Sequence, residues 1–332
     1  RRNVPQWNFQ TLNGYNLREL GTSAVAEMAV ALARLVESLE ELIGRGLTAD
    51  DRGQRAASFW SIGNDFFEEV ARIRAVRRLY GRIMTQRFRA ARSRAAWMRC
   101  HVQTSGVSLT RSEPLNNVVR AGFHALAAVL GGAQSLHVDS YDEAYSVPTE
   151  EAALLSLRTQ QIIETETGVC EVVDPLGGSF YLEALTNELE ARILDELAEI
   201  ERKGGYVAAV ESGWLQTRIR DYFHRERERM EKGEIRVVGE NAYQGETKLP
   251  EISVFEYPEG VEERMKARLG ELRLRRDNAA VEAALKGLED ACRGGANLLP
   301  ASVQCARVLC SEGEMFKVFK RAFGLWRPPA LW

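Results

Sequence analysis

The first half of the chain repeats one pattern four times: a short strand-like run, a turn that usually contains glycine, and an amphipathic helix. The strand-like runs are residues 8–13, 57–62, 98–103 and 133–138. Successive strand–helix units favour a parallel sheet with right-handed crossovers. Half of a (βα)8 barrel and a doubly wound sheet would both satisfy this pattern.

The helices of these units are predicted from apolar residues spaced three and four apart. The first helix is expected to bury Leu17, Leu20, Ala24, Met28, Leu32, Leu35 and Leu39 on one face. The third is expected to use Val119, Phe123, Leu126 and Val129, and the fourth to follow Pro148.

The composition of the strands favours a barrel. Parallel strands buried on both faces are normally rich in Val, Ile and Leu, and barrel interiors are normally filled by such residues. These runs instead carry Asn, Gln, Ser, Thr and His. Small polar side chains inside a barrel indicate an interior that holds a polar ligand.

The second half is predicted to be mostly helical. Helices are expected over residues 185–202, 214–230 and 260–291, with two shorter ones near Ala301 and Glu314 and a short strand over 235–238. We therefore expect two regions, a barrel part over residues 1–175 and a helical region over 176–332 that packs on it. The alternating Arg and Glu of these helices predicts solvated faces with i,i+4 ion pairs.

Bulk properties exclude several classes of protein. The net charge of -3 combines many charges of both signs, so we expect no binding to nucleic acid or to an anionic membrane. No apolar run reaches the roughly 20 residues that span a bilayer, and no signal peptide opens the sequence. The five cysteines are odd in number and form no CxxC pair, which favours reduced thiols and a cytoplasmic location.

The sequence lacks the short motifs that by themselves indicate nucleotide binding, a metal site or a catalytic nucleophile. It holds no GxGxxG, Walker loop, HExxH or GxSxG, and we expect no metal site. The histidines are His101 and His137 on neighbouring predicted strands, His124 on a helix, where a structural role is expected, and His224.

Six segments, in order, carry a resemblance to a known family. Residues 8–16 end in GYN and resemble N-S-I-S-I-S-G-Y-H, and Arg55 with SFWSIG at 58–63 resembles R-x-S-F-F-W-G-I-G. HVQTSG at 101–106 and NNVVR at 116–120 resemble H-C-Q-T-S-G and N-N-I-V-R. GAQSLH at 132–137 with its DEA, and DPLGGS at 174–179, resemble G-T-Q-S-L-H and D-P-W-G-G-S. Together they resemble the substrate-binding large subunit of the methylmalonyl-CoA mutase family, the adenosylcobalamin-dependent acyl-CoA mutases.

The resemblance implies an α/β fold: the C-terminal part of a (βα)8 TIM barrel, with a helical C-terminal extension. It implies radical rearrangement of an acyl-CoA, most specifically methylmalonyl-CoA to succinyl-CoA or a related branched acyl-CoA. By motif position, Tyr15 and Asn16 are expected beside the thioester carbonyl. Asn8 is expected to line the substrate channel, and Arg55 and Phe59 to contact the CoA chain. Gln103 is expected to face the corrin, and Asp139 and Glu143 to lie near the adenosyl ribose.

The sequence also departs from the family pattern. Asn16 replaces a His, Ala57 a Ser and Asp139 an Asn. These changes suggest either a different acyl group or a non-catalytic structural subunit of a heteromeric mutase. An unrelated α/β barrel that binds a phosphorylated metabolite is a third possibility, with Gly177-Gly178 as its one glycine-rich candidate.

Two features of the family have no counterpart in the sequence. The D-x-H-x-x-G motif is absent, so we expect a separate cobalamin-binding small subunit to bring adenosylcobalamin. The first barrel strands are also without a counterpart, which predicts an N-terminal barrel half as a further partner. A dimer is a further possibility.

Overall fold

A computed structural model of the chain describes residues 7–8, 10–245, 252–327 and 329. Contacts within the chain form two compact units. The first contains the sheet and continues through Phe255, and the second is Glu256–Pro328. None of the described helices combines the length and the apolar character that crossing a bilayer requires.

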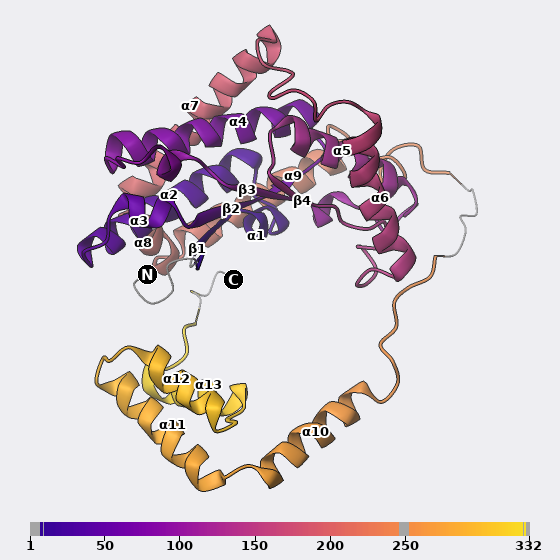
Figure 1. Ribbon diagram of the computed structural model, residues 1–332. Helices are drawn as coiled ribbons and strands as arrows, with labels where there is room; N and C mark the ends of the chain where they lie inside the picture. Colours follow the sequence, from indigo (N-terminus) through magenta and orange to yellow (C-terminus); the bar gives the residue numbers. More distant parts are fainter. Residues whose placement is uncertain (1–6, 9, 246–251, 328, 330–332) are drawn as a thin grey trace. The chain divides into compact units, whose positions relative to one another are not determined.

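The first unit is built on a sheet of four parallel strands (Figure 1). The strands are β1 (Gln10–Asn13), β2 (Ala56–Ile62), β3 (Cys100–Thr104) and β4 (Ser135–His137), in that spatial order. The parallel sheet and all four strands were predicted, although β1, β3 and β4 each begin two residues later than expected. The arrangement is a mixed α/β one that is compatible with part of a barrel.

The two faces of the sheet differ because side chains alternate along a strand. One face is mostly buried and includes Leu12, Trp60, Ile62 and Val102. The other is more open and carries Asn13, Phe59, His101, Gln103, Ser135 and His137, all partly or fully exposed. The polar residues that the sequence analysis noted in the strands therefore gather mostly on the open face.

Long helices cover the buried face (Figure 1). The helices of this unit are α1 (Tyr15–Glu19), α2 (Ala24–Gly44), α3 (Ala49–Gly53), α4 (Phe66–Arg82), α5 (Asn116–Leu130), α6 (Glu150–Glu166), α7 (Phe180–Arg202), α8 (Tyr206–Glu211) and α9 (Trp214–Glu231). Single turns lie at Ile83–Arg87, Ser93–Ala96 and Gly106–Ser108. The main core joins α2, α4 and α7 to the sheet through residues such as Leu32, Ile73 and Ile193.

The prediction of one continuous first helix was wrong. The chain breaks between α1 and α2, where Gly21 adopts φ +89° and the Ser23 hydroxyl caps α2 by accepting from Ala26 N at 3.1 Å. Leu20 lies in this break and is 61% exposed. The cap and the left-handed glycine outweigh the helical spacing of the apolar residues.

The predicted apolar face of α5 was only half correct. Leu126 and Val129 are partly buried and pack against the core. Val119 and Phe123 are exposed, whereas Ala121, His124 and Ala128 are buried. Small side chains allow a helix backbone to approach its neighbours closely, and hydropathy counting underestimates them. His124 has the structural role expected, because its Nε2 contacts Asn64 Oδ1 at 2.7 Å and burial lowers its pKa to about 4.

Helices α7 to α9 belong to the same compact unit as the sheet. The predicted helix over 185–202 begins earlier, at Phe180, and ends before Gly204 and Gly205, which both adopt positive φ. Helix α9 agrees with its prediction and carries the expected exposed pairs, such as Arg227–Glu231. Residues 235–238 do not form the predicted strand, and only an isolated bridge joins Val238 to Ala242.

The second unit contains α10 (Val261–Arg275), α11 (Asn278–Arg293), α12 (Leu298–Arg307) and α13 (Glu312–Phe323). Its core is small and includes Leu288, Cys305 and Val318. The two short helices were predicted, but the single helix over 260–291 was not correct. Asp277 ends that continuity by capping α11, accepting from Ala280 N at 3.0 Å.

Candidate active site

A row of rings crosses the open face of the sheet. Asn13, Phe59, His101 and Ser135 lie at the same level of the four strands. The Tyr15 ring stacks on Phe59, with centroids 4.9 Å apart and planes 2° apart, and Phe59 contacts His101 at 4.9 Å. His101 Nδ1 then lies 2.9 Å from Ser135 Oγ. These contacts form a continuous aromatic and polar wall.

Three predicted residues meet at the carboxyl edge of the sheet. Gln103 Nε2 donates to Tyr15 Oη at 3.0 Å and to Asp139 Oδ1 at 2.8 Å. Asp139 is only 2% exposed, and its backbone N–H donates to Thr104 Oγ1 at 2.8 Å. Its second oxygen, Oδ2, is buried without a hydrogen-bond partner. A buried acceptor without a donor is costly, so Asp139 is an incompletely satisfied carboxylate at this edge.

Two further carboxylates stand beside Gly106, immediately beyond β3. Glu19 accepts from Ser105 Oγ at 2.8 Å and from Val107 N at 3.1 Å. A Cβ on Gly106 would lie 3.0 Å from Glu19 Oε2 and 3.5 Å from Glu143 Oε1. The absence of a side chain at this glycine therefore leaves space between Glu19 and Glu143.

Burial and the nearby negative charges change the pKa values of the side chains at this edge. Burial raises the pKa of Glu143, and the nearby Asp139 and Glu19 raise it further. Burial also raises the pKa of Glu19 and of the Tyr15 hydroxyl. The hydrogen bond with Asp139 raises the pKa of His137, whose Nε2 lies 3.3 Å from Asp139 Oδ1. The edge can therefore hold protons and present both donors and acceptors.

The other predicted contacts lie away from this edge. Arg55 precedes β2 at its amino end, partly buried, and its Nε has no hydrogen-bond partner. Asn8 precedes β1 and is exposed. Phe59 lies between the two edges, four residues and about 13 Å beyond Arg55 along an extended strand.

Asn16 is not part of the cluster. It is exposed, and its backbone N–H donates to Asn13 Oδ1 at 3.3 Å. Although Tyr15 and Asn16 were predicted together, adjacent residues of a helix do not face the same way.

Sequence reasoning missed Glu19 and Ser105. A signal for Glu19 was present, because it lies four residues after Tyr15 and residues four apart share one side of a helix. Ser105 was read only as part of a motif. In the described part of the chain, no group of three or more His, Cys, Asp or Glu side chains could hold a metal ion.

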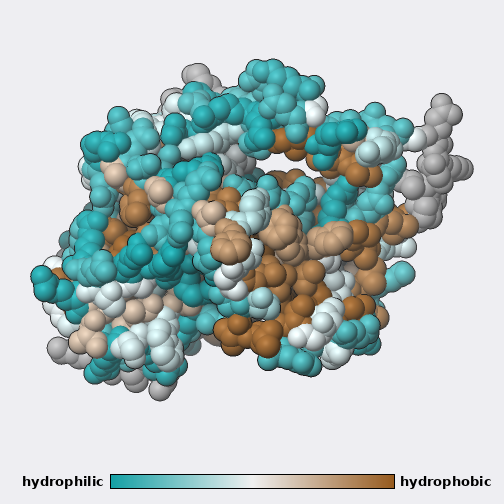
Figure 2. Space-filling view, turned by 90° about the horizontal axis from the view of Figure 1, so that it is seen from above, coloured by the Kyte–Doolittle hydropathy of each residue, from teal (hydrophilic) through white to brown (hydrophobic). Residues whose placement is uncertain are grey.

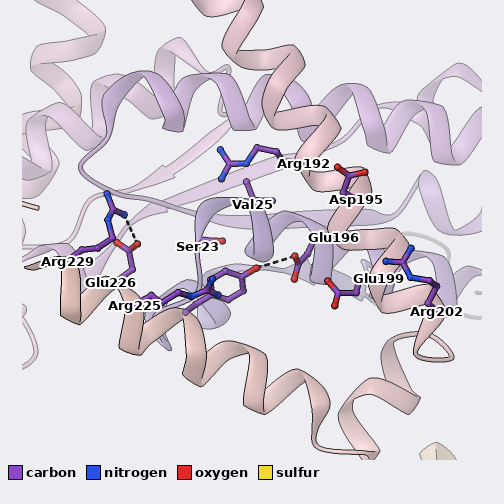
Figure 3. A pocket seen from close by; sticks show the side chains of 11 residues that line it. Ser23, Val25, Arg192, Asp195, Glu196, Glu199, Arg202, Arg225, Glu226 and Arg229 are labelled. Atoms are coloured by element: carbon purple, nitrogen blue, oxygen red, sulfur yellow. Dashed lines mark hydrogen bonds and ion pairs between the residues drawn. The ribbon is translucent and has the colours of Figure 1, made fainter. Parts of the chain in front are cut away.

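A separate cavity of about 550 Å³ lies between α7 and α9 (Figure 3). Four arginines and four carboxylates line it, and pairs such as Tyr222 with Glu196 and Arg229 with Glu226 satisfy each other. Because its charges balance, the cavity offers no net attraction to an anion such as CoA. None of the predicted site residues lines it.

An exposed apolar area lies on the face that carries α4, α5 and α7 (Figure 2). It includes Phe67, Val119, Phe123 and Tyr181, each more than 45% exposed. A cavity of about 380 Å³ here is lined by Phe66, Phe67 and Phe123 together with Arg120 and His124. It too is separate from the carboxyl-edge cluster.

Comparison with known proteins identifies the family of the chain. The family model described as methylmalonyl-CoA mutase matches residues 1–325. This chain belongs to the methylmalonyl-CoA mutase family.

Relatives in the methylmalonyl-CoA mutase family align along nearly the whole chain. The 2-hydroxyisobutanoyl-CoA mutase large subunit of Aquincola tertiaricarbonis is 38% identical over 98% of this chain and 58% of its own length. The methylmalonyl-CoA mutase of Rhizobium meliloti is 39% identical over 97% of this chain and 45% of its own. The human mitochondrial methylmalonyl-CoA mutase is 38% identical over 97% of this chain and 43% of its own length. The chain thus spans about half the length of these curated relatives.

Proposed function

We propose that this chain forms the acyl-CoA-binding part of an adenosylcobalamin-dependent mutase. The reaction would rearrange the carbon skeleton of an acyl-CoA, most specifically methylmalonyl-CoA to succinyl-CoA or a related branched acyl-CoA. The observation that carries the proposal is the junction of Tyr15, Gln103 and Asp139 at the carboxyl edge of an open, polar sheet face.

The order of the residues along the strands supports a path for the substrate. Asn8 and Arg55 lie towards the amino edge, Phe59 in the middle and Tyr15 at the carboxyl edge. The CoA chain would run over Phe59, and the thioester would lie beside Tyr15. The stacked rings would exclude water from the reacting carbon atoms, which a radical reaction requires.

The carboxyl edge fits the ribose of an adenosyl group. Asp139 Oδ2 is a buried acceptor without a donor, and Glu143 stands beside the space at Gly106. Carboxylate oxygens accept hydrogen bonds from hydroxyl groups. Gln103 would face the corrin. When bound, adenosylcobalamin would supply the radical chemistry, while this chain orients the substrate.

The partners follow from the same proposal. One relative is named a large subunit, which supports a separate small subunit that binds cobalamin. A further part of the barrel, and a dimer, would complete the assembly. The chain would work in the cytoplasm.

The departures from the family pattern bear on the substrate. Asn16 is exposed and its side chain can donate a hydrogen bond, but an amide does not titrate near neutral pH as His does. A relative that carries the name 2-hydroxyisobutanoyl-CoA mutase supports including a hydroxylated acyl group among the candidate substrates. The second candidate function, a non-catalytic structural subunit, is motivated by Asn16 and Ala57.

The test is an anaerobic assay of the complete enzyme with its cobalamin subunit and adenosylcobalamin. Methylmalonyl-CoA, 2-hydroxyisobutanoyl-CoA and other branched acyl-CoAs are supplied one at a time. We expect one of them to give an isomerised product and a substrate-dependent radical signal in electron paramagnetic resonance. A folded complex that binds CoA but gives neither with any of these substrates would overturn the proposal in favour of the structural subunit.

A further inference from the structure

A buried network of charged side chains joins α1, α2 and α4. Arg72 Nη1 donates to Glu27 Oε2 at 2.7 Å, Arg72 Nε donates to Glu69, and Arg18 Nη2 donates to Glu69 Oε1 at 3.2 Å. The side chains of Glu27, Glu69 and Arg72 are fully buried, and that of Arg18 is 18% exposed. Two positive and two negative charges balance, as burial of ions demands.

The network completes the hydrogen bonding of β2. Strand β1 ends at Asn13, opposite Phe59, so Ser61 lies beyond the last residue of β1. The Ser61 N–H donates instead to Glu27 Oε1 at 3.0 Å, and Arg72 donates to the Ser61 carbonyl. Because buried backbone groups must be paired, these ions take the place of a strand at this position.

Arg18 connects this network to α1, the helix that carries Tyr15. Helix α1 has five residues and buries none of them, and so short a helix is not stable by itself. Arg18 also donates to the Thr22 carbonyl at 3.2 Å. Burial alone would raise the pKa of Glu69, but Arg72 and Arg18 hold it below its usual value. Glu69 is therefore ionised, and its pair with Arg18 persists at neutral pH.

The loop after β2 is fitted closely to this ion pair. A Cβ on Gly63 would lie 3.2 Å from Glu69 Oε1 and 3.4 Å from Arg18 Nη2. The end of β2, the start of α4 and helix α1 therefore meet at a single pair of charges. Tyr15 begins the same short helix three residues before Arg18.

We propose that Arg18, through its ion pair with the buried Glu69, is a positioning residue that holds Tyr15 over Phe59 and within reach of Gln103. The inference rests on the proposed function, in which Tyr15 lies beside the thioester. Arg18 itself would not touch the substrate. Loss of its charge would displace Tyr15 while leaving most of the CoA contacts in place.

The test uses two substitutions of Arg18 in the complete enzyme with its cobalamin subunit. Arg18→Met removes the charge but leaves the pairs of Arg72 with Glu27 and Glu69 intact, whereas Arg18→Lys retains a cation. Arg227→Met is the matched control, because Arg227 forms an exposed pair with Glu231 on α9 at 3.0 Å. We measure kcat, KM for the acyl-CoA, and hydrogen exchange of the α1 amides.

We expect Arg18→Met to lower kcat about 10- to 100-fold, the scale of a misplacement near 1 Å, with KM changed less than roughly threefold. Exchange at α1 should rise. Arg18→Lys should recover most of both effects, and Arg227→Met should match the wild type.

A double-mutant cycle separates positioning from general stability. In a Tyr15→Ala background the ring is gone, so Arg18→Met should lower kcat little further. Independent, multiplicative losses would overturn the proposal, as would unchanged kcat and α1 exchange in Arg18→Met. Failure of Lys to rescue, with exchange raised throughout the protein, would also overturn it.

The exchange measurement does not depend on turnover. If the wild type converts none of the acyl-CoAs, the proposed function fails. Selective exchange at α1 in Arg18→Met, with rescue by Lys, would still show that the pair positions this helix. Unchanged exchange would reject that role as well.

Discussion

Asp139 contacts two side chains at the carboxyl edge of the sheet, Gln103 and His137. It accepts from Gln103, lies against His137 and keeps one oxygen without a donor. The family pattern has Asn at this position, so the chain carries an extra negative charge at its candidate cofactor site. One effect of Asp139 is on the pKa of the neighbouring His137.

Asp139→Asn should lower the pKa of His137, because the hydrogen bond with Asp139 now raises it. A raised pKa of His137 in the folded state stabilises the fold at pH values below the unfolded-state pKa, which is near 6.5. This stabilisation disappears as the pH rises through the folded-state pKa. The stability difference between wild type and variant should therefore shrink above neutral pH. NMR titration of His137 measures the shift, and Asp221→Asn on α9 should leave it unchanged. An unaltered His137 titration in Asp139→Asn would contradict the pairing.

Arg55 and Glu143 should separate two binding functions, because they lie at different edges of the sheet. Arg55→Ala should weaken CoA binding about tenfold, the scale of one charge-assisted hydrogen bond, with adenosylcobalamin binding unchanged. Glu143→Ala should do the reverse. Isothermal titration with each ligand checks both variants, and equal loss of both ligands in either variant would refute the assignment.

Some site residues could be predicted from sequence and others could not. Tyr15, Gln103 and Asp139 come together because each follows or ends a parallel strand, and motif order locates those strand ends. The network of Glu27, Glu69 and Arg72 could not be foreseen, because charged residues in an amphipathic helix normally face water. This network pairs the backbone groups of β2 that lie beyond the end of β1. Only the register of the two strands shows that such groups exist.

At the scale of elements, the turn from β1 into α1 depends on close packing. A Cβ on Gly14 would lie 2.7 Å from Trp60 Cε3 and 2.8 Å from Glu27 Cγ. Trp60 is fully buried in the core, so it cannot move aside easily. The contact ties the start of α1 to the centre of the sheet.

Gly14→Ala should destabilise the fold by about 1–3 kcal/mol, the usual cost of overpacking. Gly44→Ala is the matched control, since nothing lies within 4 Å of a Cβ there, and it should be neutral or stabilise by up to about 1 kcal/mol. Urea unfolding of the two variants and the wild type measures the difference. Equal stabilities for Gly14→Ala and wild type would show that the turn tolerates a side chain.

Elements were predictable where periodicity was strong and unbroken. The strands and α9 followed their patterns, whereas the breaks at Gly21 and Asp277 depend on local capping that outweighs periodicity. Helix α5 shows the other limit. Its buried side is mostly alanine, which carries little hydropathy, and so the larger Phe123 was wrongly expected inside.

At the scale of the whole molecule, the two compact units have separate cores. The core of the second unit, which includes Leu288, Cys305 and Val318, draws only on residues of that unit. Leu288 is completely buried there, whereas Leu274 on α10 is 87% exposed. Changes in this core should therefore remain local.

Leu288→Ala should destabilise the second unit by about 2–5 kcal/mol, as buried leucines usually do, and leave the first unit unaffected. Leu274→Ala should change neither. Hydrogen exchange resolved to α11 and α2 tests both expectations. Parallel increases of exchange in α2 and α11 would mean that the units unfold together.

The outer strands of the described sheet are its shortest, four residues in β1 and three in β4 against seven in β2. A short edge offers few unpaired backbone groups to another chain, so this sheet is a poor template for intermolecular β growth. The apolar area over α4, α5 and α7 carries the greater risk of self-association. Concentrated solutions of this chain should therefore form amorphous precipitate, suppressed by mild detergent, and not fibrils that bind amyloid dyes.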